Sequence, residues 1–375
     1  MKRLSILGST GSIGRQTLDV IRSLPGQFEV VGLASGYNID LFAEQLNEWR
    51  PAVASTEGSL DILKSLYGFP CTWGSIEDVA VYGDSQIVVA ASSGSSGLRP
   101  IMAAIEHGKD IALANKEPVV MAGELLLERS RKRNVNILPI DSEPSGIWQC
   151  LRGEAKKISR IIITGSGGPF RRRAFQELSS VTPEEALNHP TWRMGRKITV
   201  DSATLMNKAF EVIEAHWLFD IPWENIEVVI HPQSIVHAMV EFSDKSIKAQ
   251  LSPADMRIPI QGAITYPDRI DNKDIAGLDL LSLGSLDFEE VDMRKYPCFP
   301  IALEAARKGG SYPAVLSAAD EVAVDLFLNG SIKFMDIPRL LEEVLSEHKS
   351  VTDLSIDTIL EADGWARRTA LERFG

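Results

Sequence analysis

The chain starts with a short apolar run, residues 4–7, followed at once by closely spaced glycines, Gly8-Ser-Thr-Gly-Ser-Ile-Gly14. Apolar residues then recur at helical spacing until Pro25-Gly26, and a second apolar run covers 28–34. A strand, a glycine turn, a helix and a second strand in this order predict the first βαβ unit of a Rossmann-like sheet. The N–H groups at the start of that helix would face a pyrophosphate. A glycine triad spaced GxxGxxG is also compatible with a simple tight turn.

The loop after the second strand bears on the choice of dinucleotide. It reads Ser35-Gly36-Tyr37-Asn38 and has no carboxylate before Asp40, whereas an acidic residue here would hold the ribose of NAD. The uncharged loop therefore favours NADP, although it holds no Arg or Lys to neutralise the 2′-phosphate. An ordinary turn explains Tyr37 and Asn38 equally well.

The rest of the first third continues the alternation of strands and helices. Apolar strands are expected at 86–91, 111–114 and 136–140, and helices at 98–107 and 120–132. This pattern predicts a doubly wound, mostly parallel sheet, and we expect a Rossmann-like domain over residues 1–140.

The pattern changes after residue 140. Strands are expected at 158–164 and 226–230, and an antiparallel hairpin at 236–243 and 246–251, which indicates a central α+β domain over 141–266. The polar stretch 267–290 is typical of a linker. Helices expected at 300–308, 313–328, 338–348 and 356–374 predict a C-terminal helical bundle over 291–375.

Composition excludes several classes of protein. The 375 residues carry a net charge of −12, which argues against a nucleic-acid surface, and no apolar stretch is long enough for a membrane span. Three distant cysteines indicate neither a disulfide framework nor a zinc site. We expect a cytoplasmic protein whose thiols are buried.

Two acidic residues follow the strand at 136–140. Side chains at positions i and i+2 of an extended segment point the same way, so Asp141 and Glu143 could share a divalent cation such as Mg²⁺ or Mn²⁺. The alternative is a helix start, with Asp141 or Ser142 as the cap.

A second glycine-rich turn, Thr164-Gly-Ser-Gly-Gly-Pro169, follows the strand at 158–164. Consecutive N–H groups around Ser166 can bind an anion, which predicts a phosphate cradle. In isolation the same turn is equally typical of a flexible loop.

The segment 189–214 holds the densest set of polar residues. Asp201-Ser-Ala-Thr204 is interpreted as a helix start that brings Ser202, Asn207 and Lys208 together, as a phosphate monoester requires. Glu211 could add a third carboxylate to the metal, or it could be a solvated surface charge.

The preceding loop, residues 186–196, carries His189, Trp192 and Met194 among polar neighbours. A loop that carries a Trp and a Met is a candidate lid over a substrate, although a Trp that packs on an adjacent domain is as common. His231 and His237 have no suitably spaced carboxylate partner, so we expect structural histidines there and no metal site.

Six motifs together resemble one family, 1-deoxy-D-xylulose 5-phosphate reductoisomerase. They are GSTGSIG at 8–14, LANKE at 113–117, PIDSE at 139–143, TGSGGPF at 164–170, HPTWRMGRKITVDSATLMNK at 189–208 and VIHPQS at 229–234. The resemblance implies a homodimeric oxidoreductase that rearranges 1-deoxy-D-xylulose 5-phosphate and reduces it with NADPH to 2-C-methyl-D-erythritol 4-phosphate, in the non-mevalonate route to isoprenoids.

The resemblance also implies roles for individual residues. Asp141, Glu143 and Glu211 would bind Mn²⁺, Mg²⁺ or Co²⁺, with Lys116 and His189 as further catalytic residues. The substrate would contact Ser142, Glu143, Ser166, His189, Trp192, Ser202, Asn207, Lys208 and Glu211. NADPH would contact Thr10, Gly11, Ser12, Ile13, Gly36, Asn38, Asn115, Lys116, Glu117 and Gly195.

Two positions depart from the family pattern. Tyr37 stands where members often carry a basic residue, which bears on the preference for NADPH over NADH. Pro144-Ser-Gly146 stands where a His is common, which alters the approach to the metal. Two other hypotheses remain: an NADP-dependent dehydrogenase of an amino-acid semialdehyde, which needs no metal, and a dinucleotide-sensing module without catalytic activity.

Overall fold

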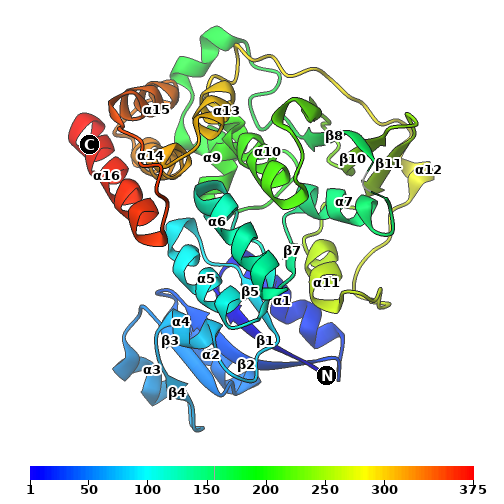
Figure 1. Ribbon diagram of the computed structural model, residues 1–375, viewed down its shortest axis with the longest axis vertical. Coiled ribbons are helices and arrows are strands. Elements are labelled where there is room, and N and C mark those ends of the chain that lie inside the picture. The colour runs from blue at the N-terminus through cyan, green and yellow to red at the C-terminus, as the bar shows by residue number, and fades with distance from the viewer. Residues whose placement is uncertain (156) are drawn as a thin grey trace. The chain divides into compact units, whose positions relative to one another are not determined.

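The computed structural model describes residues 1–155 and 157–375 (Figure 1). The chain forms two compact units. The first comprises 1–115, 126–145 and 255–276, and the second comprises 116–125, 146–254 and 277–375. The divisions at 115/116, 125/126 and 145/146 place short neighbouring stretches of chain in different units.

The first unit is built on a parallel sheet of seven strands in the order β4-β3-β2-β1-β5-β6-β7. The strand order reverses between β1 and β5, and in such sheets ligands bind at the carboxyl ends of the strands at that point. The strands are β1 Lys2–Leu7, β2 Phe28–Ser35, β3 Val53–Thr56, β4 Thr72–Trp73, β5 Ile87–Ala90, β6 Asp110–Leu113 and β7 Ile137–Pro139.

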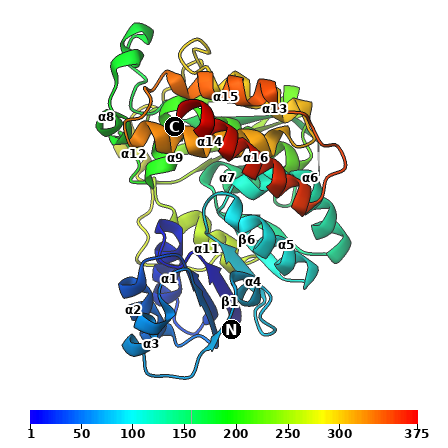
Figure 2. The same cartoon turned by 90° about the vertical axis from the view of Figure 1, so that its left-hand side faces the viewer.

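Helices cover both faces of this sheet, as a doubly wound fold requires. Figure 2 shows α1, α2 and α3 on one side of the strands and α4 and α5 on the other. Their bounds are α1 Ser12–Ser23, α2 Ile39–Trp49, α3 Leu60–Leu66, α4 Ile76–Ala80 and α5 Leu98–Glu106, and α6 follows at Glu117–Arg133. The predicted Rossmann-like sheet is confirmed.

A segment from late in the chain completes the first unit. Helix α11 (Arg257–Thr265) packs against α1. The Lys2 ammonium donates to the carbonyl of Ile264 at 3.2 Å, and the Asn272 amide donates to Ser23 Oγ at 2.8 Å. These bonds fasten the return segment to the start of the sheet.

The second unit contains a four-stranded mixed sheet in the order β11-β10-β8-β9. Strand β8 (Ile158–Gly165) runs parallel to β9 (Ile226–Ile230) and antiparallel to β10 (Val236–Phe242), which forms the predicted hairpin with β11 (Ile247–Leu251). The α+β part of the prediction is therefore confirmed. The helices around this sheet are α7 Ser142–Leu151, α8 Pro183–Leu187, α9 Arg196–Thr204 and α10 Met206–Phe219.

The last part of the chain is helical, as predicted. Figure 1 shows α14 beside α15 and α16, and α14 buries nearly every side chain along its length because helices pack on it from several sides. Phe327 and Phe170 each pack edge-on against Phe334. The helices are α12 Leu280–Leu283, α13 Cys298–Lys308, α14 Tyr312–Leu328, α15 Asp336–Glu347 and α16 Ile356–Phe374. None of the described helices combines the length and the apolar character that a membrane span requires.

Candidate active site

The first glycine turn is tightly packed where β1 meets β5. Gly8 has a φ of +83°, and a Cβ there would lie 2.3 Å from the carbonyl oxygen of Ala91. A Cβ on Gly14 would lie 2.3 Å from the Gly8 carbonyl oxygen. Only glycine fits these two positions, which brings the start of α1 close to the end of β1. No side chain caps α1 at Gly11, so its N-terminal N–H groups can bind an anion.

The loop after β2 lies next to this turn. Thr10 Oγ1 and Ser35 Oγ are 2.9 Å apart. The Asn38 side chain accepts from the N–H of Leu41 at 3.3 Å and so caps α2, while the Tyr37 side chain is 77% exposed. The loop therefore presents polar groups but no cation at the place where a dinucleotide ribose binds in such folds.

Lys116 follows β6 and is buried in the second unit. Its ammonium donates to Asn207 Oδ1 and lies 3.5 Å from a carboxylate oxygen of Glu211, which is fully buried. Neighbouring Asn115 belongs to the first unit, where its N–H donates to the carbonyl of Ala90 at 3.0 Å. The resemblance named these residues, but no sequence pattern predicts the contact between Lys116 and Asn207.

The three acidic residues named above come together. Within the described residues, Asp141, Glu143 and Glu211 form a group whose ligand oxygens lie within 4.8 Å of one another. Three carboxylates offer only hard oxygen ligands, which suit Mg²⁺ or Mn²⁺ better than zinc. The reasoning that placed Asp141 and Glu143 on an extended segment was wrong, because α7 begins at Ser142 and Glu143 lies in its first turn. The predicted alternative of a helix start is thus correct as local structure.

Glu211 is held by two other predicted site residues. The Asn207 amide donates to one of its oxygens at 2.5 Å, and the Lys208 ammonium donates to the other at 2.7 Å. The predicted helix start at Asp201 is wrong: α9 ends at Thr204, Leu205 takes a left-handed φ of +64°, and α10 starts at Met206. Asn207 and Lys208 therefore lie in the first turn of α10, whereas Ser202 lies near the end of α9.

The second glycine turn packs against the end of α9. Ser166 Oγ accepts from the N–H of Gly168 at 3.1 Å. A Cβ on Gly168, whose φ is +66°, would lie 2.6 Å from the carbonyl oxygen of Ser202. The Tyr296 hydroxyl donates to the Gly167 carbonyl at 2.9 Å and fixes the turn from the other side.

His189 joins the two serines. Its Nε2 lies 3.0 Å from Ser166 Oγ and 3.1 Å from Ser202 Oγ, and its Nδ1 accepts from the N–H of Trp192 at 2.9 Å. Because Nδ1 accepts, the neutral ring carries its hydrogen on Nε2. Burial, followed by the charge of Lys208, lowers the pKa of His189 to about 4, so the ring is neutral at physiological pH. The loop residue is thereby a hydrogen-bond donor aimed at the two hydroxyls.

The other residues of the loop 186–196 are compatible both with a lid over a substrate and with a loop held in place by packing of Trp192. The Trp192 ring is 6.1 Å from the ring of His237, which belongs to the same unit, and Met194 is half-buried. Gly195 is the N-cap of α9.

His231 makes the contacts of a structural histidine. Its Nδ1 lies 2.8 Å from the Asp287 carbonyl oxygen, and its ring stacks on Phe288. Its buried Nε2 has no partner in the described part of the chain.

One buried charge cluster was missed by the sequence reasoning. Lys197 of α9 contacts Asp201 at 2.6 Å and Asp320 of α14 at 2.7 Å. Lys197 and Asp201 are four residues apart, a signal for a helical ion pair that could have been noticed. Asp320 lies too far along the chain for any local pattern to find it.

These features define a class of protein. A glycine turn at the reversal of strand order, a group of three carboxylates and a second turn rich in serine and glycine are the parts of a dinucleotide-dependent oxidoreductase with a divalent metal centre.

Comparison with known proteins identifies the family within this class. A family model described as 1-deoxy-D-xylulose 5-phosphate reductoisomerase matches residues 4–123, and two models of its C-terminal domains match 137–219 and 251–369. The reductoisomerase of Prosthecochloris aestuarii is 51% identical, with 99% of each chain covered, and that of Bacillus cereus is 49% identical over 100% of both. The chain therefore belongs to the 1-deoxy-D-xylulose 5-phosphate reductoisomerase family.

Solved structures agree with this assignment. The reductoisomerase of Zymomonas mobilis, in complex with NADPH, superposes with a TM-score of 0.92 at 37% identity and covers 100% of this chain and 99% of its own. A structure of the enzyme with NADPH, fosmidomycin and magnesium gives a TM-score of 0.91 at 37% identity, with 100% and 98% covered. The predicted family and fold class are confirmed, and the matches over the full length argue against the semialdehyde dehydrogenase and the sensing module.

Proposed function

We propose that this chain performs its family's reaction with the site residues named above. As a member of the family, it converts 1-deoxy-D-xylulose 5-phosphate to 2-C-methyl-D-erythritol 4-phosphate, consuming one NADPH and one proton, in non-mevalonate isoprenoid synthesis. Our domain assignment is an NADPH domain over 1–140, a catalytic domain over 141–266, a linker over 267–290 and a helical domain over 291–375.

The metal would be held by Asp141, Glu143 and Glu211. The observation that carries this proposal is the spacing of their oxygens, within 4.8 Å of one another. A divalent ion held there supplies positive charge to the substrate oxygens. Lys116, 3.5 Å from Glu211, is suited to hold a substrate oxygen next to that charge. Ser142 is the first residue of α7, the helix whose first turn carries Glu143. Oxygen ligands alone accommodate Mn²⁺ and Co²⁺ as well as Mg²⁺.

The substrate phosphate would lie between the second glycine turn and α9. Ser166, Ser202 and His189 already form a hydrogen-bonded group, in which the Nε2–H of His189 is available as a donor. Asn207 and Lys208 would complete the phosphate site from the first turn of α10. Because His189, Trp192 and Met194 share one loop, substrate binding would also close that loop and exclude water.

NADPH would bind along the first glycine turn. The uncapped start of α1 at Gly11, Ser12 and Ile13 suits the pyrophosphate, and Thr10 and Gly36 lie on the adjoining loops. NADPH supplies the hydride for the reduction. Asn38, Asn115, Lys116, Glu117 and Gly195 complete the proposed cofactor contacts.

The test is NADPH oxidation, followed at its near-ultraviolet absorbance, with 1-deoxy-D-xylulose 5-phosphate and Mg²⁺ or Mn²⁺. We expect activity that disappears with chelator and falls by more than about a hundredfold in Glu211→Gln, beyond the loss typical of outer-shell partners of a metal. Asp363→Asn removes another buried carboxylate, on α16, and should remain active. Metal-independent activity in Glu211→Gln would contradict the assigned ligands.

A homodimer is the proposed assembly. Strand β11 lies at the edge of its sheet and its Ile247 side chain is 50% exposed, and Leu281 of α12 is 94% exposed. Exposed edges and apolar side chains of this kind suit pairing with a second copy. Light scattering should give twice the chain mass of 41.2 kDa, and the mass of a single chain would refute the proposal.

The cytoplasm is the proposed compartment. All three cysteines are free thiols, as a reducing environment maintains them. Fractionation of the source cells with an antibody against the chain tests this, and recovery from an extracytoplasmic fraction would contradict it.

A further inference from the structure

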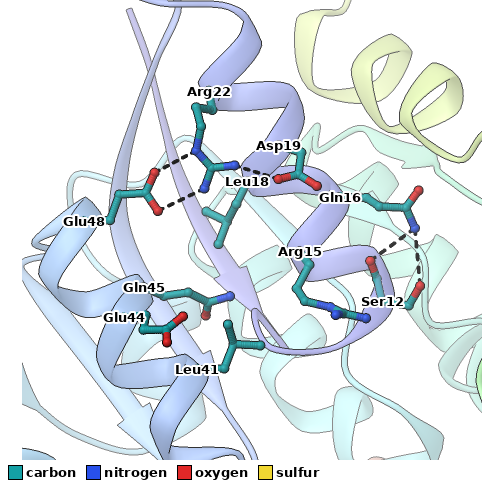
Figure 3. Close-up of a pocket in the computed structure, with 10 residues that line it drawn as sticks. All are labelled: Ser12, Arg15, Gln16, Leu18, Asp19, Arg22, Leu41, Glu44, Gln45 and Glu48. Carbon is teal, nitrogen blue, oxygen red and sulfur yellow. Dashed lines mark hydrogen bonds and ion pairs between the residues drawn. The ribbon is translucent and has the colours of Figure 1, made fainter. Parts of the chain in front are cut away.

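A pocket of about 300 Å³ lies between α1 and α2, beside the first glycine turn (Figure 3). The side chain of Gln45 in its wall is tied to that turn, since its amide donates to the Ser9 carbonyl at 2.9 Å and its oxygen accepts from Ser9 Oγ at 2.8 Å. The pocket is lined by Ser12, Arg15, Gln16, Leu18, Asp19, Arg22, Leu41, Glu44, Gln45 and Glu48.

Two arginines line this pocket, and they differ in their partners. Arg22 pairs with Glu48 at 2.8 Å and with Asp19 at 2.6 Å, and these contacts raise its pKa. The Arg15 side chain is exposed and makes no hydrogen bond or ion pair with the described residues of the chain. Of the two arginines that line the pocket, Arg15 is therefore the one whose charge is available to bind an anion.

Arg15 is also well placed relative to the glycine turn. It lies one helical turn after Ser12, the first residue of α1, and helical side chains lean toward the N-terminus of their helix. Figure 3 draws the Arg15 guanidinium beside Ser12. Leu41, on the opposite wall, lies three residues after Asn38, so the pocket opens near the loop that follows β2.

That loop lacks the charge that an NADPH site needs. The 2′-phosphate of NADP lies at the end of the second strand in Rossmann-like folds, where an arginine usually accommodates it. Residues 35–38 contain no cation, and the ring of Tyr37 extends into solvent. The contact between Thr10 and Ser35 brings this loop against the glycine turn from which α1 starts.

We propose that Arg15 binds the 2′-phosphate of NADPH and sets the preference for NADPH over NADH. The inference rests on the proposed function, because it assumes that the dinucleotide binds along this turn. The planar guanidinium suits two parallel hydrogen bonds to phosphate oxygens. Glu44 also lines the pocket, and its negative charge opposes the phosphate, so it limits the affinity that Arg15 provides.

The experiment compares the binding of NADPH and NADH by nicotinamide fluorescence, without substrate or metal. Arg15→Gln should weaken NADPH about ten- to hundredfold, the effect of losing charged hydrogen bonds, and leave NADH within about twofold. Arg15→Lys should restore part of the difference. Arg22→Gln, on the same helix but already paired, is the matched control and should leave the NADPH to NADH ratio unchanged.

A second probe isolates the phosphate. Adenosine 2′,5′-bisphosphate should displace NADPH from the wild type more strongly than adenosine 5′-monophosphate does, and Arg15→Gln should abolish that advantage. Equal weakening of NADPH and NADH, or an unchanged ratio, would overturn the proposal for Arg15. A wild-type protein that binds neither dinucleotide would instead refute the cofactor assignment in the proposed function. Failure of the Arg15 proposal and failure of the cofactor assignment therefore give different results.

Discussion

Replacement of Lys197 by Met should destabilise the protein strongly. The Lys197 ammonium contacts Asp201 at 2.6 Å and Asp320 at 2.7 Å, and these carboxylates are 2% and 0% exposed. Each has a second oxygen that is buried without a hydrogen-bond partner among the described residues. Lys197 is therefore the main compensation for the negative charge that these two carboxyl groups carry where water does not reach them.

The magnitude follows from the cost of leaving a buried charge unpaired. Removal of one member of a buried ion pair costs about 3–5 kcal/mol, and here both carboxyl groups also lose the hydrogen bond that Lys197 donates, so we expect the upper end of that range. This is a large fraction of the roughly 5–15 kcal/mol that stabilises a typical protein. Lys308→Met, which breaks a contact with Glu304 between two exposed side chains, should cost less than about 1 kcal/mol.

A double-mutant cycle separates charge from packing. Asp320→Asn in the Lys197→Met background removes a buried carboxylate that has lost its cation, so it should recover stability, whereas in the wild type it should cost stability. The assay is urea unfolding at neutral pH followed through the seven tryptophans. Additive effects, or a loss below about 1 kcal/mol for Lys197→Met, would refute the reasoning.

The same cluster predicts a pH dependence. Burial, followed by the charge of Asp320, raises the pKa of Asp201 well above its usual range. The folded state therefore holds this proton more tightly than the unfolded state does, so the stabilisation is present at acid pH and is lost as pH rises through the raised pKa. Asp320→Asn should reduce this slope, and an unchanged slope would show that the two carboxylates do not interact.

Three further predictions concern the site. His189, with a pKa of about 4, should contribute stability that is present above about pH 6.5 and lost as pH falls toward 4, and nitrogen NMR should show a neutral ring with hydrogen on Nε2 at neutral pH. Gly168→Ala should raise KM for the substrate by about tenfold or more, since its Cβ would lie 2.6 Å from a backbone oxygen. Gly26→Ala is the control, because Gly26 has a φ of +78° and a Cβ there would meet no atom within 4 Å. This control should cost only about 1–2 kcal/mol of stability and leave KM unchanged. Mg²⁺ should increase the affinity for inorganic phosphate in calorimetric titrations, because a metal ion on Glu211 weakens its hold on Lys208, and equal affinities with and without Mg²⁺ would contradict this coupling.

Local patterns were sufficient wherever the chain's own periodicity decides the structure. The first glycine turn, the hairpin of β10 and β11 and the four long C-terminal helices were predicted to within a few residues, because each is specified by apolar spacing and by turn residues adjacent in sequence.

The break between α9 and α10 could not be predicted in this way. Leu205 adopts a left-handed conformation that leucine rarely takes, and its side chain is only 1% exposed. Tertiary packing therefore overrides local preference at this residue. The predicted helix start at Asp201 failed because Asp201 and Ser202, although of residue types that favour helix starts, lie inside α9, and the sequence around Leu205 gives no sign of the break.

The pairing of distant residues is the second limit. Lys116 contacts Asn207 across 91 positions and Lys197 contacts Asp320 across 123, and no spacing rule connects residues so far apart. In both pairs burial makes the partner a requirement, since an ammonium enclosed without an acceptor would lose its charge.

Glu211 explains why the proposed metal and phosphate sites would function as one unit. Its two oxygens accept from Asn207 and Lys208, which are also the proposed phosphate ligands, and the same carboxylate belongs to the group of possible metal ligands. A cation on Glu211 would compete with the ammonium and the amide for the same oxygens, so metal binding and release of the proposed phosphate ligands would be linked. The spacing of four residues between Asn207 and Glu211 on one helix provides this link, because it places both side chains on one face. Leu205, in the left-handed conformation, is the N-cap of α10 and so places Asn207 in the first turn of that helix. The break that could not be predicted from the sequence therefore also sets where Asn207 and Glu211 lie along α10.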